Sequence, residues 1–245
     1  MIKEYSKTFY MSAGECNPQG EMPVSLLVSR LIEIATLHAN SWGVGFDRLI
    51  SDNHAWVLSR VTTEMKRYPR AGEDYEIITW IEDYNRHFSQ RNMEIRSATT
   101  GEVLGFARTI WMVIDLAART GVDISQLSYI SSNVSPRECP IEPQSRLRPV
   151  ADATRTTEHT FGYTDCDFNR HVNTVRYLEL LMNQFSLSHY DNNFIARMEM
   201  AFVKETHYGA TAQVLINDSD EADTRFSINV EDTDRVRCRF TWKQR

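Results

Sequence analysis

The chain has 245 residues, enough for one large domain or two small ones, and its 42% apolar and 24% charged residues are typical of a soluble globular protein. The formal net charge of −6 argues against a nucleic-acid-binding surface, which would need an excess of positive charge. The cysteines are far apart, and neither a signal peptide nor an apolar run near the roughly 20 residues of a membrane span is present, so we expect a cytoplasmic protein.

The first predicted elements are a short strand at residues 5–11 and one long helix. Pro23 stands where the helix would begin, ahead of apolar residues at helical spacing. This stripe comprises Leu26, Leu27, Leu31, Ile34, Ala35 and His38. Strand-like segments follow at residues 75–82, 92–96 and 103–114.

A proline-rich stretch divides the chain. It holds four of the seven prolines, namely Pro136, Pro140, Pro143 and Pro149. Prolines at this density are typical of a connector and do not suit a core element. We therefore predict a first repeat at residues 1–130, a linker at residues 131–150 and a second repeat at residues 151–245.

The second part follows the plan of the first. A short strand at residues 159–163 precedes a helical stripe formed by Val175, Leu178, Leu181, Met182 and Phe185. Strand-like segments follow at residues 197–203, 212–217, 226–230 and 235–243. In the last segment apolar and charged residues alternate, which predicts an antiparallel strand covered on one side only. The whole pattern predicts an α+β fold, in which one long helix is wrapped by a curved antiparallel sheet, twice in tandem.

The chemistry-bearing residues gather at the start of the second helix. Asp167, Asn169 and His171 place a carboxylate, a carboxamide and an imidazole within five residues. The free backbone N–H groups and the dipole of a helix entrance favour developing negative charge, as arises when water attacks a thioester or ester carbonyl. A structural alternative is an Asx-turn at Asp167 with Asn169 as the helix cap. A metal at this place has no third ligand that the sequence reveals.

Strings in both parts resemble the acyl-acyl-carrier-protein thioesterases, the tandem hot-dog enzymes of plants and bacteria, over nearly the whole chain. In the first part these strings are Trp-Val-Leu-Ser-Arg at 56–60, Arg-Tyr-Pro-Arg-Ala-Gly-Glu at 67–73, Thr-Trp at 79–80, and Thr-Gly-Glu-Val-Leu at 100–104, which leads to Trp111. In the second part they are Asp-Phe-Asn-Arg-His-Val-Asn at 167–173, followed by Tyr177, and Val-Lys-Glu-Thr at 203–206. The resemblance implies a tandem hot-dog fold.

The resemblance also implies an activity: hydrolysis of the thioester between a fatty acyl chain and carrier-protein phosphopantetheine, which ends fatty acid synthesis. The family's catalytic residues carry over as Asp167, Asn169, His171 and Glu205. We expect His171 and Glu205 to meet at one buried point and activate water. Asp167 would fix the loop, and Asn169 with backbone N–H groups would stabilise the oxyanion. No cofactor or metal is implied.

Two departures from the plant members shape this interpretation. Plant members have cysteine where this chain has Thr206, so attack by water is favoured and Thr206 receives no catalytic role. The chain also has no segment like their transit peptide, which suggests a bacterial, cytoplasmic member. Cys166, beside Asp167, is a poor candidate nucleophile because no second base is dedicated to it.

Substrate-binding residues are expected around the helix start and in the first repeat. Asn173 and Tyr177 would shape the cleft wall, and Trp56 is a further candidate contact. The aromatic residues Trp42, Phe46, Trp56 and Trp80 are nevertheless expected mainly in the core. Because the first repeat lacks the catalytic string, we expect it to bind the acyl chain and set its length.

The implied partner is an acidic acyl carrier protein. Candidate docking residues are Lys66, Arg67, Arg70, Arg146, Arg148 and the arginines of the final strand, with a solvated charged face as the alternative. Three other functions stay open: an acyl-CoA thioesterase, a hot-dog dehydratase, and a non-catalytic acyl-binding module. The oligomeric state, a monomer acting as a pseudo-dimer or a homodimer, also stays open.

Overall fold

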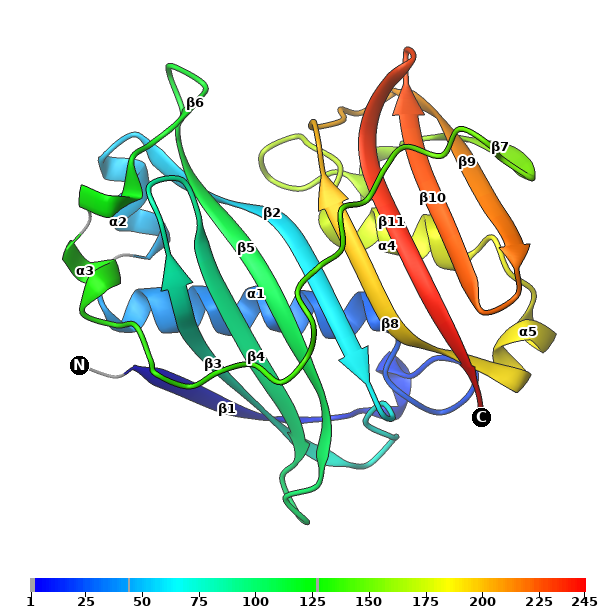
Figure 1. The fold of residues 1–245 in the computed structure, drawn as a ribbon, viewed down its shortest axis with the longest axis horizontal. Coiled ribbons are helices and arrows are strands. Elements are labelled where there is room, and N and C mark those ends of the chain that lie inside the picture. The colour runs from blue at the N-terminus through cyan, green and yellow to red at the C-terminus, as the bar shows by residue number, and fades with distance from the viewer. Residues whose placement is uncertain (1–2, 44, 127) are drawn as a thin grey trace.

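The computed structural model describes residues 3–43, 45–126 and 128–245 (Figure 1). The side chain of Phe46, one of the expected core aromatics, lies outside the described part. None of the helices in the described ranges combines the length and the apolar character that crossing a membrane requires.

The first part of the chain forms one long helix and most of a sheet. Its elements are β1 (Glu4–Tyr10), a 3-10 turn (Ala13–Glu15), α1 (Val24–Ser41), α2 (Phe46–Ser51), β2 (His54–Met65), β3 (Asp74–Tyr84), β4 (Ser89–Ser97), β5 (Val103–Asp115), β6 (Thr120–Gly121), a 3-10 turn (Ile124–Gln126) and α3 (Ser128–Ser131). The predicted helix is confirmed, with Pro23 as its N-cap and Leu27, Leu31 and Ile34 fully buried. Strand β2 was not predicted.

The second part repeats this plan with a shorter helix. Its elements are β7 (Arg155–Thr160), a 3-10 turn (Tyr163–Asp165), α4 (Thr174–Met182), α5 (Leu187–Asn192), β8 (Asn193–Phe202), β9 (Thr211–Asp220), β10 (Asp223–Val230) and β11 (Thr233–Gln244). The expectation of a second long helix reaching Phe185 is wrong, because α4 has 9 residues against 18 in α1. The chain turns after Met182, and Ser186 then caps α5 by accepting a hydrogen bond from the N–H of His189.

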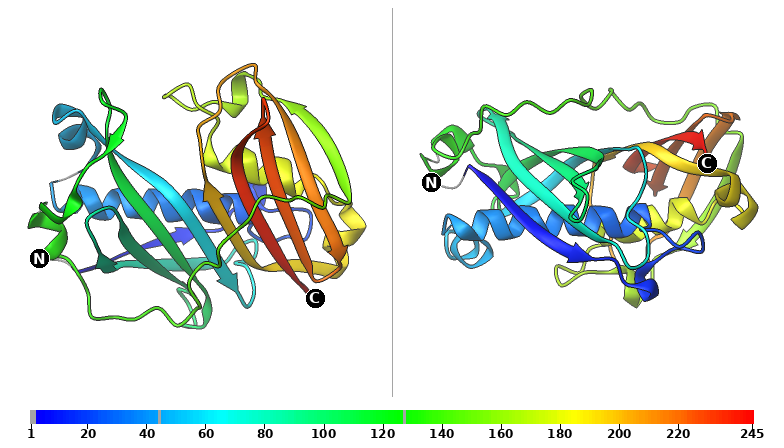
Figure 2. Two further views of the ribbon diagram at one scale, coloured as in Figure 1. Left: turned by 45° about the horizontal axis from the view of Figure 1, so that its top comes forward. Right: turned by 90° about the horizontal axis from the view of Figure 1, so that it is seen from below.

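The strands of both parts form one antiparallel sheet. This 11-stranded sheet runs in the order β1-β3-β4-β5-β2-β8-β11-β10-β9-β7, with β6 beside β5. The two parts join where β2 pairs with β8, from Arg60 opposite Ala201 to Glu64 opposite Arg197. Helices α1 and α4 contact each other and lie against the same face of the sheet (Figure 2). Buried side chains between helices and sheet form one apolar cluster that extends through both parts.

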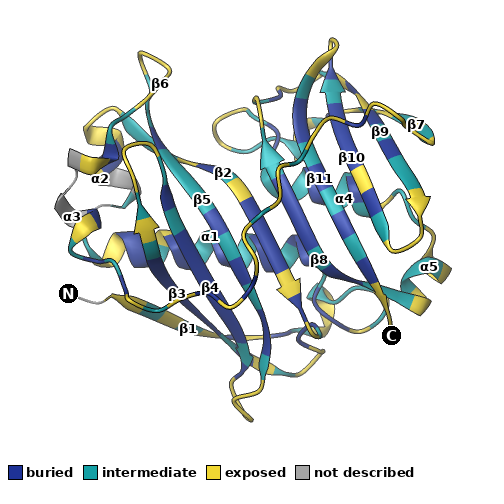
Figure 3. Cartoon of the chain, in the orientation of Figure 1, coloured by how far each residue is buried: buried dark blue, intermediate teal, exposed yellow. Residues whose placement is uncertain are grey.

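The segment between α3 and β7 lies across the opposite face of the sheet (Figure 1). Ser145 N–H donates to Glu199 on β8, at 2.9 Å, and Val150 N–H donates to Ser227 on β10, at 2.8 Å. Arg237 on β11 donates to the carbonyl of Leu147, at 3.0 Å. The last strand is antiparallel and alternates buried with partly exposed residues, as predicted, and the connector covers part of its outer face, where Arg237 binds the backbone of Leu147. Figure 3 shows buried residues along β8 and β11 beneath this segment.

Candidate active site

A tight loop presents the predicted catalytic string ahead of α4. One carboxylate oxygen of Asp167 accepts the backbone N–H groups of Asn169, at 2.8 Å, and His171, at 3.3 Å. The N–H of Asp167 donates in turn to the carbonyl of His171, at 2.8 Å. Arg170 turns the chain with a φ of 63°, in the left-handed region. Asp167 thus forms the Asx-turn that was weighed as the structural alternative, and it fixes the loop.

The start of α4 is capped by Asn173 and not by Asn169. The Asn173 side chain accepts the N–H of Val175, at 2.9 Å, as an N-cap residue should. Tyr177, one turn further, is 3% exposed and packs edge-on against Phe161. Burial raises the pKa of Tyr177 to about 12, an effect that Thr206 and Arg235 partly offset. Asn173 and Tyr177 therefore order the helix start.

His171 and Glu205 meet although they are far apart in the chain. Val172 N–H donates to the carbonyl of Thr206, at 2.8 Å, and His171 forms a backbone bridge with His207. This pairing brings Nδ1 of His171 to 3.6 Å from Oε2 of Glu205. The two side chains are 28% and 34% exposed, so they lie at the surface and not at the buried point that we expected.

Two arginines hold Glu205 in place. Arg119 donates to its carboxylate, and Arg235 donates to its backbone carbonyl, at 3.0 Å. Arg119 comes from the turn between β5 and β6, so the first part of the chain contributes to the charge of this site. Arg119 was not predicted from the sequence, because the residues around it give no indication that it contacts the other half of the chain.

A third possible metal ligand, His207, lies beside the imidazole–carboxylate pair of His171 and Glu205. The ring of His207 lies edge-on to that of His171, with ring centroids 4.9 Å apart. Ligand atoms of His171, Glu205 and His207 all lie within 4.8 Å of one another, close enough to share a divalent cation. The sequence revealed no third ligand here, and His207 now supplies one.

Cys166 is poorly suited to be the nucleophile. Burial, together with the carboxylates of Asp165 and Asp167, raises the pKa of the Cys166 thiol. The thiolate is the reactive form, and a raised pKa keeps the sulfur protonated near neutrality. Cys166 is therefore a poor candidate nucleophile in the structure as well.

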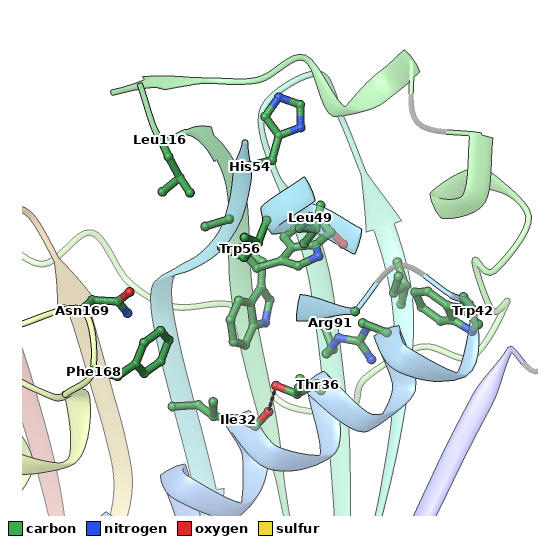
Figure 4. A pocket seen from close by; sticks show the side chains of 18 residues that line it. Ile32, Thr36, Trp42, Leu49, His54, Trp56, Arg91, Leu116, Phe168 and Asn169 are labelled. Atoms are coloured by element: carbon green, nitrogen blue, oxygen red, sulfur yellow. Dashed lines mark hydrogen bonds between the residues drawn. The ribbon is translucent and has the colours of Figure 1, made fainter. Parts of the chain in front are cut away.

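A mostly apolar cavity of about 300 Å³ leads from the loop into the first part of the chain (Figure 4). Phe168 and Asn169 line one end, and Trp42 and Arg91 line the other. Most of the other lining residues come from the helices α1 and α2 and the strands β2 to β5, and they include Ile32, Ala35, Ala39, Leu49, Ile81 and Trp111. Cavities of this kind are the usual binding places of small apolar ligands.

The expected core aromatics divide into two groups. Trp80 is fully buried and donates to the carbonyl of Arg137, at 2.6 Å, so its core role is confirmed. Trp42 and Trp56 are partly buried; both pack against the apolar cluster around Ile81 and Val113, as expected of core residues, and both also line the cavity.

Some of the candidate docking residues are held in ion pairs within the molecule, and others are exposed. Arg67 is bound to Glu73 and Glu102, and in the final strand Arg237 pairs with Asp234 and Arg239 with Asp223. The remaining candidates, Lys66, Arg70, Arg146 and Arg148, are exposed. The arginines of the final strand are therefore mostly paired with carboxylates of the same molecule.

Two family models together cover most of the chain. The model of the acyl-ACP thioesterase N-terminal domain matches residues 2–127, and that of the C-terminal domain matches residues 150–244. The palmitoyl-acyl carrier protein thioesterase of Gossypium hirsutum is 23% identical over 92% of this chain and 57% of its own length. The oleoyl-acyl carrier protein thioesterase 1 of Arabidopsis thaliana is 24% identical over 71% of this chain and 52% of its own. The chain spans slightly more than half the length of these curated relatives.

Two solved structures share the architecture. An acyl-ACP thioesterase from Bacteroides thetaiotaomicron superposes with a TM-score of 0.89 at 28% identity, over 98% of both chains. The 12:0-ACP thioesterase from Umbellularia californica superposes with a TM-score of 0.90 at 19% identity, over 100% of this chain and 99% of its own. The predicted α+β, tandem hot-dog fold is thereby confirmed.

Proposed function

Because this chain belongs to the acyl-ACP thioesterase family, we propose that it hydrolyses the thioester between a fatty acyl chain and acyl carrier protein. Release of the free fatty acid would end its synthesis. The observation that carries this proposal is the contact of His171 Nδ1 with Glu205 Oε2, at 3.6 Å, beside the loop whose Phe168 and Asn169 line the cavity. An acyl chain in the cavity would place its thioester near this loop.

Water is the nucleophile in the proposed mechanism. His171 accepts a proton from water while Glu205 orients the ring and stabilises its charged form. The hydroxyl oxygen attacks the thioester carbon, and the tetrahedral intermediate then expels the phosphopantetheine thiolate, to which His171 returns the proton. Thr206, 2% exposed, lies behind the loop and takes no part.

The carboxamide of Asn169 is the proposed donor to the oxyanion. The N–H groups of Asn169, His171 and Val175 already have acceptors within the loop and the helix cap. The N–H groups of Arg170, Val172 and Asn173 have acceptors as well, so the backbone would contribute mainly through the dipole at the start of α4. Asp167 acts by holding this loop in shape.

We assign the two repeats different tasks. Residues 1–130 would bind the acyl chain, residues 131–150 would connect the repeats, and residues 151–245 would supply the catalytic residues. One chain would act as a pseudo-dimer, because β2 and β8 already pair the two sheets. Four free cysteines fit a reducing compartment, and we place the protein in the cytoplasm of a bacterium.

Hydrolysis assays with purified carrier-protein thioesters test the proposal. The variants His171→Ala and Glu205→Gln should lower kcat by roughly 10²- to 10⁴-fold, the usual contribution of general acid–base groups. Their circular dichroism and Tm should match the wild type because both side chains are partly exposed. Cys166→Ser is the matched control and should keep its turnover. Folded His171→Ala and Glu205→Gln proteins with full turnover would refute the mechanism.

Substrate comparison separates the remaining alternatives. Thiol release that is faster from carrier-protein thioesters than from CoA thioesters supports the proposal, and the reverse order makes the protein an acyl-CoA thioesterase. An enoyl product without thiol release would identify a dehydratase. Acyl binding without any turnover would identify a binding module.

A further inference from the structure

Arg91 on β4 is a buried cation with an unusual set of neighbours. Its side chain lines the cavity, yet the residue is only 6% exposed. One guanidinium nitrogen, Nη1, contacts Nδ1 of His38 at 2.8 Å and donates to the hydroxyl of Thr79 at 3.2 Å. The guanidinium also lies over the ring of Trp42, 5.5 Å from its centroid. None of these three partners is a carboxylate.

No carboxylate contacts the guanidinium of Arg91 within the described residues, and its burial lowers its pKa to about 9. Other sheltered arginines of this sheet do have such partners. Arg108 pairs with Glu82, and Arg197 pairs with Glu199. Burying a charge without a counter-charge is costly. Packing alone therefore does not explain why a charged residue is buried at position 91 without a carboxylate beside it.

A second donor without an acceptor borders the same cavity. The indole N–H of Trp56 is buried and has no hydrogen-bond acceptor in the described part of the structure. Buried polar groups nearly always have a partner, so an unpaired one at a cavity wall suggests that a ligand completes it. Trp56 and Arg91 thus give this mostly apolar cavity two hydrogen-bond donors.

The position of Arg91 decides which part of a ligand it would meet. Figure 4 shows Arg91 and Trp42 at one end of the cavity, and Phe168 and Asn169 of the catalytic loop at the other. A thioester held at the loop would direct its acyl chain toward Arg91. On the basis of the proposed function, we propose that the cavity accepts acyl chains that carry a carboxylate at their far end, which Arg91 binds.

The charge of the site favours a carboxylate over other oxygen groups. A carboxylate matches the fork of the guanidinium and neutralises it, whereas a hydroxyl group accepts a hydrogen bond but leaves the charge uncompensated. A methyl end would leave the buried charge of Arg91 without a counter-charge. The expected order of preference is therefore carboxylate, then hydroxyl, then methyl.

Three carrier-protein thioesters of equal chain length, ending in carboxylate, hydroxyl or methyl, test the inference. For the wild type we expect kcat/KM to be about 10-fold or more higher for the carboxylate-ended chain than for the methyl-ended chain, which corresponds to one charge-assisted hydrogen bond. Arg91→Met should invert this order, because it replaces the cation by an apolar side chain of similar length. Arg96→Met is the matched control on the same strand, since Arg96 is partly exposed and bound to Glu76, and it should keep the wild-type order.

The outcomes distinguish this inference from the proposed function. A wild type that hydrolyses the methyl-ended chain best overturns the inference and leaves the thioesterase function intact. The same holds if Arg91→Met folds and keeps the wild-type order. If no thioester is hydrolysed, the proposed function fails, and calorimetric binding of the three chains as N-methyl amides, which have no carboxylate at the head, then tests Arg91 alone. Equal affinity for all three amides would overturn the inference.

Discussion

Arg119, in the turn between β5 and β6, binds the carboxylate of Glu205, which follows β8 in the other half of the chain. The two side chains are 51% and 34% exposed, so the pair contributes little to stability. Its consequence is positional: a residue of the first repeat fixes the carboxylate that faces His171.

Arg119→Ala should therefore act on turnover and not on folding. We expect kcat to fall by about 10-fold, because the Glu205 carboxylate is then no longer held in its position beside His171. KM and Tm should change little. Steady-state kinetics and thermal unfolding measure these effects. Arg119→Lys keeps a cation and should recover part of kcat. An unchanged kcat in Arg119→Ala would show that Glu205 needs no such support.

Asn169→Ala should remove the proposed oxyanion donor. A lost donor of this kind costs on the order of 3 kcal/mol of barrier, or roughly 10²-fold in kcat. Asn169 is exposed and its backbone N–H stays bound to Asp167, so the loop should keep its shape. Phe168→Leu, at the neighbouring cavity wall, should instead change KM. A loss in Asn169→Ala that lies wholly in KM would argue against oxyanion stabilisation.

Asn173→Ala should destabilise the protein by about 1 kcal/mol, because the N-cap of α4 is lost. Asn173→Ser keeps a side-chain oxygen at the cap and should restore most of the free energy of unfolding. Urea denaturation of the three proteins measures this. If Asn173 instead contacts substrate, the serine variant will be stable but will show a raised KM.

Added Zn²⁺ should inhibit turnover by binding His171, Glu205 and His207, whose ligand atoms lie within 4.8 Å of one another. His207→Ala should weaken this inhibition by about 10-fold and keep the metal-free rate, because His207 lies outside the water-activating pair. His159→Ala, on β7, is the control and should be inhibited like the wild type. Equal inhibition of all three proteins would place the metal elsewhere.

Glu73 should make stability depend on pH in the acid range. Hydrogen bonds from Arg67 lower the pKa of Glu73 from its usual 4.5 to about 2. A lowered folded-state pKa means that this stabilisation is complete above pH 4.5 and is lost as the pH falls toward 2. Glu73→Gln should thus be less stable than the wild type near neutrality, on the order of 1 kcal/mol, and nearly equal to it at pH 2. Chemical denaturation across this range measures the difference, and a constant difference at every pH would contradict it.

The amphipathic patterns predicted most of the fold. The helix α1 and the last strand were found because apolar residues recur at the spacing of one buried face. The strand β2 was missed because it lies in the middle of the sheet, between β5 and β8, and the buried Val61, Thr62 and Thr63 follow one another without alternation. The second helix was overestimated because Phe185 continues the spacing beyond Asn183, where α4 ends.

The sequence predicted the part of the candidate site that consists of residues close together in the chain. The string at residues 167–173 lies together because it forms one turn, and the resemblance supplied Glu205. Arg119, His207 and Arg91 were missed because each reaches the site through tertiary structure, and an isolated arginine or histidine carries no signal of its own. The cavity was likewise beyond prediction, because its walls come from several separate elements.

The pairing of β2 with β8 also determines whether the two repeats could exist as separate soluble proteins. If the chain were cut within residues 131–150 and the repeats were separated, β2 and β8 would each lose a hydrogen-bonded neighbour. An uncovered strand edge readily recruits another copy and promotes aggregation. Because both repeats belong to one polypeptide, the two strand edges are held at high effective concentration. Each edge therefore pairs within the chain before it can pair with another molecule.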